Sequence, residues 1–128
     1  MLKRLYAAYE AQDAAAMASL LTDDAFVLLP GNRGLAGTHR GRDESAGFFS
    51  MVWAQAPDGF ELDIHEVLAN EHHGLVIVRV TAKRGADRYE EWETHVHELN
   101  DGSSAGVFIY LNDCTPAELY FSAPQADA

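Results

Sequence analysis

The chain has 128 residues, of which 48% are hydrophobic and 10% aromatic, and this composition is typical of a folded globular protein rather than a disordered one. Nine basic residues against 20 acidic ones give a formal net charge of −11. Nucleic acids and anionic membrane surfaces both repel such a protein, so neither is expected as a partner. The length predicts one domain over residues 1–128.

Cysteine usage and hydropathy indicate the compartment. Cys114 is the only cysteine, so no intramolecular disulfide can form, which favours a reducing environment. The first residues include Lys3, Arg4 and Glu10 and lack the apolar run of a signal peptide. No window approaches the roughly 18 apolar residues of a membrane span. We therefore expect a cytoplasmic protein.

The N-terminal half predicts three helices and one short strand. Apolar residues recur at helical spacing from Leu2 to Tyr9, and Asp13 suits the N-cap of a second helix that ends near residue 22. Residues 25–29 form an apolar strand. Glycines at 31, 34, 37 and 41 then predict a loop without phosphate-binding spacing, and residues 42–56 a third helix that stops before a proline.

The C-terminal half predicts a meander of strands. Apolar or alternating segments cover residues 60–69, 75–82, 89–99 and 107–111, with a hairpin signal at residues 100–102. Residues 114–122 are expected to form a short helix or tail. When helices come first and a long antiparallel sheet follows, the helices must cover one face of that sheet. We predict an α+β fold, a cone-shaped roll in which three N-terminal helices pack on a strongly curved, mainly antiparallel sheet that encloses a pocket.

Five segments carry a family resemblance. They are AAYEAQDAAAMASLLTDDA, LPGNRGLAGTHRGRDESAGFF, FELDIHEVLAN, HGLVIVRVTAKR and HVHELNDG, and the glycine-loop segment is the most specific. Together they resemble the SnoaL-like branch of the nuclear transport factor 2-like superfamily, which has the ketosteroid isomerase and polyketide cyclase-like fold. The superfamily also includes epoxide hydrolases, dehydratases and non-enzymatic binding or scaffold proteins, so the resemblance implies the fold without settling the function.

The resemblance also implies where catalytic groups would lie. The isomerases' carboxylate base falls on Leu29, their protonated aspartate on Thr94, and their tyrosine donor near Leu5, one residue from Tyr6. The cyclases' acid–base aspartate falls near Ile109. The usual catalytic carboxylates are therefore expected to be missing.

The alternation between residues 91 and 97 predicts which side chains line the pocket. Only the even positions suit an apolar interior, and burying unpaired glutamates would be costly. We therefore expect an inward-facing set completed by aromatic residues of the helices and the first strand: Tyr6, Tyr9, Phe26, Phe49, Trp53, Trp92, Thr94 and Val96. Apolar walls with a few polar groups are typical of small-molecule sites.

Candidate catalytic groups are few. Glu98, Asp113 and Tyr6 are the polar residues expected nearest the pocket, although Glu98 also suits a solvated strand end and Asp113 a turn or cap. His95 and His97 form an H-x-H pair that could bind a metal with a third ligand, but none is evident, so we predict neither metal nor cofactor.

The sequence thus predicts a SnoaL-like protein that binds a small apolar organic ligand, with isomerase- or cyclase-like catalysis as one possibility. The alternative is a non-catalytic binding or interaction domain of the same fold. A homodimer is expected because the apolar strand at residues 75–80 needs cover on both faces. Family members usually pair through the outer sheet face, which here would include Phe108 and Tyr110.

Overall fold

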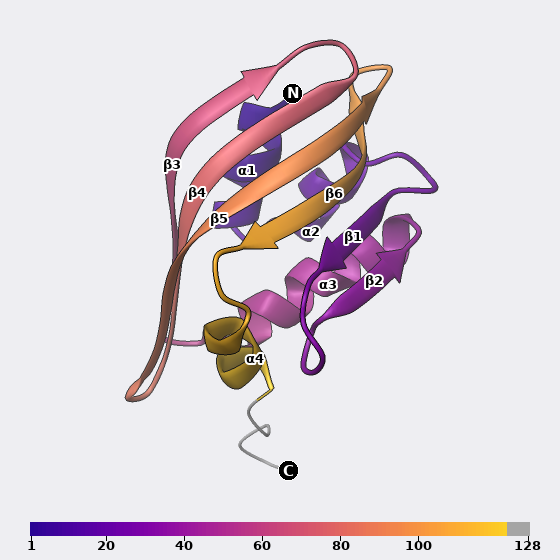
Figure 1. Ribbon diagram of the computed structural model, residues 1–128. Coiled ribbons are helices and arrows are strands. Elements are labelled where there is room, and N and C mark those ends of the chain that lie inside the picture. The colour runs from indigo at the N-terminus through magenta and orange to yellow at the C-terminus, as the bar shows by residue number, and fades with distance from the viewer. Residues whose placement is uncertain (123–128) are drawn as a thin grey trace.

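The computed structural model describes residues 1–122 and shows a strongly bent sheet wrapped around helices (Figure 1). The elements in chain order are α1 (Leu2–Glu10), α2 (Ala14–Ser19), β1 (Phe26–Leu29), β2 (Gly37–Arg40), α3 (Arg42–Ala54), β3 (Gly59–Ala69), β4 (His73–Arg84), β5 (Asp87–Asn100), β6 (Ser103–Leu111) and α4 (Thr115–Phe121).

The six strands form one sheet in the order β2-β1-β6-β5-β4-β3. Every pair is antiparallel except β1 and β6, which run parallel with Val27 opposite Val107. This confirms the predicted α+β roll and its mainly antiparallel sheet. β2 was missed, because its four residues lie inside the glycine-rich segment and only one of them, His39, is not exposed.

Two register shifts help the long strands to curve. One lies in β3 between Ile64 and Glu66, and the other in β5 between Glu98 and Leu99. An extra residue in one strand bends it and increases its twist. In Figure 1, β3 to β6 arch around α1, while α3 crosses beneath the sheet.

The core lies between the helices and the concave sheet face. β4 contributes Val76, Val78 and Val80, all almost inaccessible, while α1 and α3 contribute Leu5 and Phe48. Phe48 also contacts the ring of Phe49 edge-on, a favourable arrangement for aromatic rings.

Local sequence fixes the helix ends. Asp13 is the N-cap of α2, where its side chain accepts a hydrogen bond from the amide of Ala16 at 3.0 Å, as expected. Gly41 precedes α3 with a φ of 94°, a conformation that favours glycine. Asp43 and Glu44 in the first turn of α3 complement the helix dipole.

α4 is fastened to the end of α3. Arg84 donates hydrogen bonds to the Gln55 side chain at 2.7 Å and to the Tyr120 carbonyl at 3.0 Å, and its guanidinium lies over the Tyr120 ring. The Tyr120 hydroxyl donates to the Gln55 carbonyl at 2.6 Å. These bonds hold Phe121 of α4 against Tyr89.

Of the four helices in residues 1–122, α3 is the longest at 13 residues, and none is long and apolar enough to cross a membrane.

Candidate functional site

The inner face of β5 carries the polar residues of that strand, the reverse of the prediction. Glu93 is 7% exposed and His95 and His97 are each 2% exposed, whereas Trp92 is 48% exposed. The expectation that Trp92, Thr94 and Val96 face the interior is therefore wrong.

The physical reason is that Glu93 is not buried unpaired. Its Oε2 accepts a hydrogen bond from the Tyr89 hydroxyl at 2.7 Å, and its Oε1 lies 2.7 Å from His95 Nε2. Paired in this way, a carboxylate can be buried at far lower cost than an isolated one. The desolvation argument assumed that no partners existed, yet two lie on the same strand, at positions 89 and 95.

Tyr6 joins the two histidines. Its hydroxyl oxygen lies 2.5 Å from His95 Nδ1 and 2.8 Å from His97 Nε2. His97 Nδ1 in turn lies 2.9 Å from the hydroxyl of Ser104, and that hydroxyl lies 3.3 Å from the Gly106 carbonyl. Six groups from α1, β5 and β6 therefore form one buried chain, which we call the inner network: Tyr89, Glu93, His95, Tyr6, His97 and Ser104.

Burial keeps several of these groups neutral. It raises the pKa values of the Tyr6 and Tyr89 hydroxyls above the ordinary 10, and nearby Glu93 adds to the effect. Burial, together with neighbouring His95, lowers the pKa of His97 to about 3. At neutral pH the two tyrosines are therefore hydroxyl donors, and His97 is an uncharged imidazole.

A small closed cavity lies at the Glu93 end of the inner network. Its volume is about 10 Å³, and Glu93 is the one acidic side chain among the described residues that line it. Apolar and aromatic residues form the rest of its wall, among them Tyr9, Val80 and Phe121. They come from α1, α3 and α4, from β1, β4 and β6, and from the loop between β1 and β2. The interior of the cone is thus almost completely filled by side chains, with one carboxylate at its surface.

The other predicted pocket residues fall into two groups. Tyr9 lines the cavity, and Phe49 and Trp53 pack against its ring at centroid distances of 4.8 and 6.3 Å. Phe26 is a further error. Its ring packs on Phe108 with centroids 5.0 Å apart, and both lie on the outer side of the sheet because the alternate residues of β1 and β6 are the buried ones.

The candidate catalytic groups are also divided. Tyr6 is buried in the inner network. Glu98 is exposed at the end of β5 on the outer face. Asp113 is exposed, and a hydrogen bond from the Thr115 amide lowers its pKa, so it acts as a cap for the turn before α4. Neither Glu98 nor Asp113 is placed to serve the cavity.

The positions that the resemblance assigned to family catalysts can now be placed. Leu29 and Ile109 both line the cavity, so their apolar side chains occupy its wall. Thr94 does not, because the inward neighbours of this position are Glu93 and His95. A buried carboxylate, Glu93, lies one residue away from this position.

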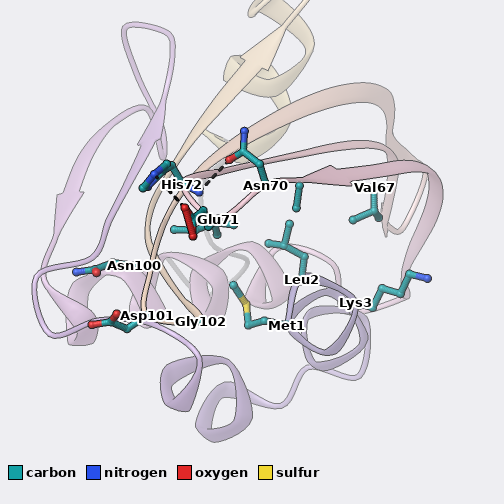
Figure 2. A pocket seen from close by; sticks show the side chains of 12 residues that line it. Met1, Leu2, Lys3, Val67, Asn70, Glu71, His72, Asn100, Asp101 and Gly102 are labelled. Atoms are coloured by element: carbon teal, nitrogen blue, oxygen red, sulfur yellow. Dashed lines mark hydrogen bonds and ion pairs between the residues drawn. The ribbon is translucent and has the colours of Figure 1, made fainter.

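A second, open groove lies at the other end of the cone (Figure 2). It has a volume of about 680 Å³ and lies between the start of α1 and the turns after β3 and β5, near Leu2, Asn70 and Asp101. Its polar residues are solvated: the side chains of Glu71 and His72 are 87% and 76% exposed. Solvated groups are not tuned for chemistry, so the inner network is the better candidate site.

Metal ligation finds no support in the part of the chain that is described. Within residues 1–122, no three His, Cys, Asp or Glu side chains are grouped so that they could hold a metal ion. Both ring nitrogens of His95 and of His97 lie within hydrogen-bonding distance of protein partners. The absence of a required metal stays a prediction.

Comparison with known proteins identifies the family. The model of the SnoaL-like domain matches residues 2–106. The chain belongs to the SnoaL-like domain family. No protein of curated function matches its sequence.

Several solved structures share the fold at low sequence identity. Bal32a, from a soil-derived mobile gene cassette, is 24% identical with a TM-score of 0.87, over 94% of this chain and 92% of that one. An NTF2-like protein of unknown function from Burkholderia pseudomallei is 18% identical with a TM-score of 0.80, over 95% of both chains. TerC, co-crystallised with polyporic acid, is 19% identical with a TM-score of 0.78, over 93% of this chain and 94% of TerC. At these identities the likeness shows the fold alone.

Proposed function

We propose that this SnoaL-like protein binds a small aromatic or polycyclic molecule inside the cone and exchanges a proton with it through Glu93. The observation that supports this most is the Glu93 carboxylate, placed in the wall of an otherwise apolar cavity and hydrogen-bonded to His95 at 2.7 Å. A carboxylate in such surroundings is suited to act as a general acid or base on a ligand that brings an acidic O–H or C–H group.

The site replaces the usual family carboxylates with a different one. Leu29 and Ile109 supply apolar wall where the resemblance implies acidic groups, and Glu93 supplies the charge from β5. Tyr89 and His95 keep the carboxylate in one orientation. An isomerase- or cyclase-like reaction on a hydrophobic substrate would need such a fixed acid–base group, and TerC, which shares the fold, was co-crystallised with an organic small molecule, polyporic acid.

Access requires movement, because ligand sites commonly measure about 300–1,000 Å³ and this cavity is about 10 Å³. Phe121 of α4 lines it, and α4 is only seven residues long, held chiefly by Arg84 and Tyr120. Outward displacement of α4 is the simplest change that would open the cavity beside Glu93.

The test uses two probes of nearly equal size. 2-Naphthol has an apolar ring system and a hydroxyl group that can donate a hydrogen bond to a carboxylate. 2-Methoxynaphthalene has the same ring system but no hydroxyl proton to donate. We expect the protein to bind 2-naphthol at least tenfold more tightly, since a hydrogen bond to a charged group contributes about 1.5–3 kcal/mol. Glu93→Gln should abolish the preference. Glu98→Gln, on the exposed side of the same strand, should keep it.

Phe121→Ala should raise the affinity for both probes by enlarging the cavity. If neither the natural protein nor Phe121→Ala binds either probe, or if the preference survives Glu93→Gln, the proposed function is wrong.

The outer sheet face favours a second candidate, an interaction domain that pairs with a second copy of itself. Trp92 and Tyr110 are 48% and 56% exposed there, beside half-buried Phe108. Large exposed apolar side chains gathered on one face indicate an association surface. Sedimentation equilibrium should give twice the 14.1 kDa chain mass, and Trp92→Glu should give the monomer. A natural protein that is monomeric at micromolar concentration would exclude the dimer.

A further inference from the structure

We propose that the inner network is a hydrogen-bond relay, which transmits bond direction rather than a proton: every hydrogen bond from Glu93 to Ser104 reverses together when the Glu93–His95 pair gains one proton. The proposal rests on the proposed function only in its use, because the relay is a property of the protein without ligand. Tyr6, His97 and Ser104 are then positioning residues that act through His95.

The first protonation state follows from counting donors. An ionised Glu93 can only accept, so His95 must carry its proton on Nε2. His95 Nδ1 is then an acceptor and takes the hydroxyl proton of Tyr6. The Tyr6 oxygen in turn accepts from His97 Nε2–H, and His97 Nδ1 accepts from the Ser104 hydroxyl. All these groups are paired, and each tyrosine or serine hydroxyl donates once.

The second state follows by adding one proton. In this state Glu93 is protonated and its O–H donates to His95 Nε2, while His95 is the Nδ1–H tautomer and donates to the Tyr6 oxygen. The Tyr6 hydroxyl turns to His97 Nε2, and His97 donates from Nδ1 to the Ser104 oxygen. The Ser104 hydroxyl then donates to the Gly106 carbonyl, 3.3 Å away. One proton has been gained, none has been lost, and no group is left unpaired.

This reversal matters because an unpaired buried donor or acceptor costs about 1–3 kcal/mol. A bound ligand that gives its proton to Glu93 keeps the bonding electron pair, and the state in which every buried group is paired then has both histidines neutral as Nδ1–H tautomers. Neutral His97 fits this role, because its pKa is lowered to about 3 by burial and by His95.

The surroundings supply few competing charges. Facing the network are Tyr9 from α1 and Glu91 from β5, apart from its own members. The described residues of β4 that pack beneath it, Val76, Val78 and Val80, are apolar. The direction of the hydrogen bonds is therefore set mainly by the members of the network themselves.

Nitrogen NMR of ¹⁵N-histidine-labelled protein tests the relay, because it distinguishes the two neutral tautomers and the imidazolium. At pH 7 the natural protein should hold His95 and His97 as Nε2–H tautomers. Glu93→Gln imitates the protonated carboxyl: its amide carbonyl can accept from Tyr89 and its N–H₂ can donate to His95. In that variant both histidines should become Nδ1–H tautomers. Glu91→Gln is the matched control and should match the natural protein.

Two further variants locate the coupling. In the double variant Glu93→Gln with Tyr6→Phe, His95 should change its tautomer and His97 should not. In the double variant Glu93→Gln with Ser104→Ala, His97 should stay in the Nε2–H form. If Glu93→Gln does not fold, acidification of the natural protein substitutes for it: His97 should pass to the Nδ1–H form without becoming an imidazolium. Unchanged His97, or an imidazolium signal from it, overturns the relay. Because no ligand is used, failure of the proposed catalysis would leave this result standing, and the reverse also holds.

Discussion

The two faces of β5 differ in how their polar and apolar groups are satisfied. On the inner face, Glu93, His95 and His97 are almost completely buried, and each has specific hydrogen-bond partners. On the outer face, Trp92 keeps nearly half of its surface exposed, beneath the guanidinium of Arg79 at 5.5 Å. The difference shows that polarity alone does not decide which side of a strand enters the core, because partners on neighbouring elements can offset the cost of burial.

The largest expected effect is on the inner face. Glu93→Ala removes the acceptor of both the Tyr89 hydroxyl and the His95 ring. The free energy of unfolding should fall by about 3–5 kcal/mol, the range for breaking one partner out of a buried pair. Thr94→Ala, one residue away on the outer face, should cost less than about 1 kcal/mol. Urea denaturation measures both, and equal losses would contradict the assignment of the faces.

The outer face is tightly packed between β1 and β6. A Cβ atom at position 106 would lie 2.1 Å from Phe26 Cε1, so Gly106→Ala must displace that ring. We expect a loss of about 1–3 kcal/mol in unfolding free energy, typical of overpacking. The double variant with Phe26→Ala should lose less than the sum of the two single changes. Strict additivity would show that the ring does not lie against Gly106.

The pH dependence of stability sharpens the comparison further. His97 has a pKa of about 3 in the folded protein and about 6.5 when unfolded. Between pH 6.5 and about pH 3, His97 is therefore protonated in the unfolded chain but not in the folded protein. As the pH is lowered through this range, the contribution of His97 to stability falls by about 1.4 kcal/mol per pH unit. Comparing the natural protein with His97→Gln between pH 7 and 5 isolates this slope. If the unfolding free energies of the two proteins change with pH by the same amount, the lowered pKa of His97 is refuted.

The smallest effect is expected at Trp92. With its ring half exposed and touching mainly His65 and Arg79, Trp92→Ala should lower the unfolding free energy of the monomer by less than about 1 kcal/mol. A fully packed ring would cost about 3–5 kcal/mol. Denaturation at a concentration below the dimer's dissociation constant separates this effect from loss of pairing. A loss above about 3 kcal/mol would place the ring inside.

Much of the fold could be predicted from the sequence because periodicity and turn chemistry are local signals. Asp13 as a cap and the hairpin at residues 100–102 are examples, and both are present in the structure. The face of β5 could not be predicted from alternation, since both faces alternate equally well. The deciding contact is Tyr6 with His95 and His97, which are 89 and 91 residues away in the chain.

The sequence did contain a signal for the site. Tyr89, Glu93, His95 and His97 share one parity within β5, so they lie on one face and can satisfy each other. A set of complementary donors and acceptors on one face is as compatible with burial as an apolar set. What remained hidden was Ser104, which reaches His97 only through pairing of β5 with β6.

The central claim is that the odd-numbered residues of β5 face the helices, and nuclear Overhauser spectra test it most directly. The ring protons of Tyr6 should give cross-peaks to the rings of both His95 and His97, whose centroids lie 5.7 Å away. The Trp92 indole should give cross-peaks to His65, with the centroids 5.8 Å apart. Cross-peaks from Trp92 to Tyr6 or Tyr9, with none between Tyr6 and the two histidines, would contradict the account.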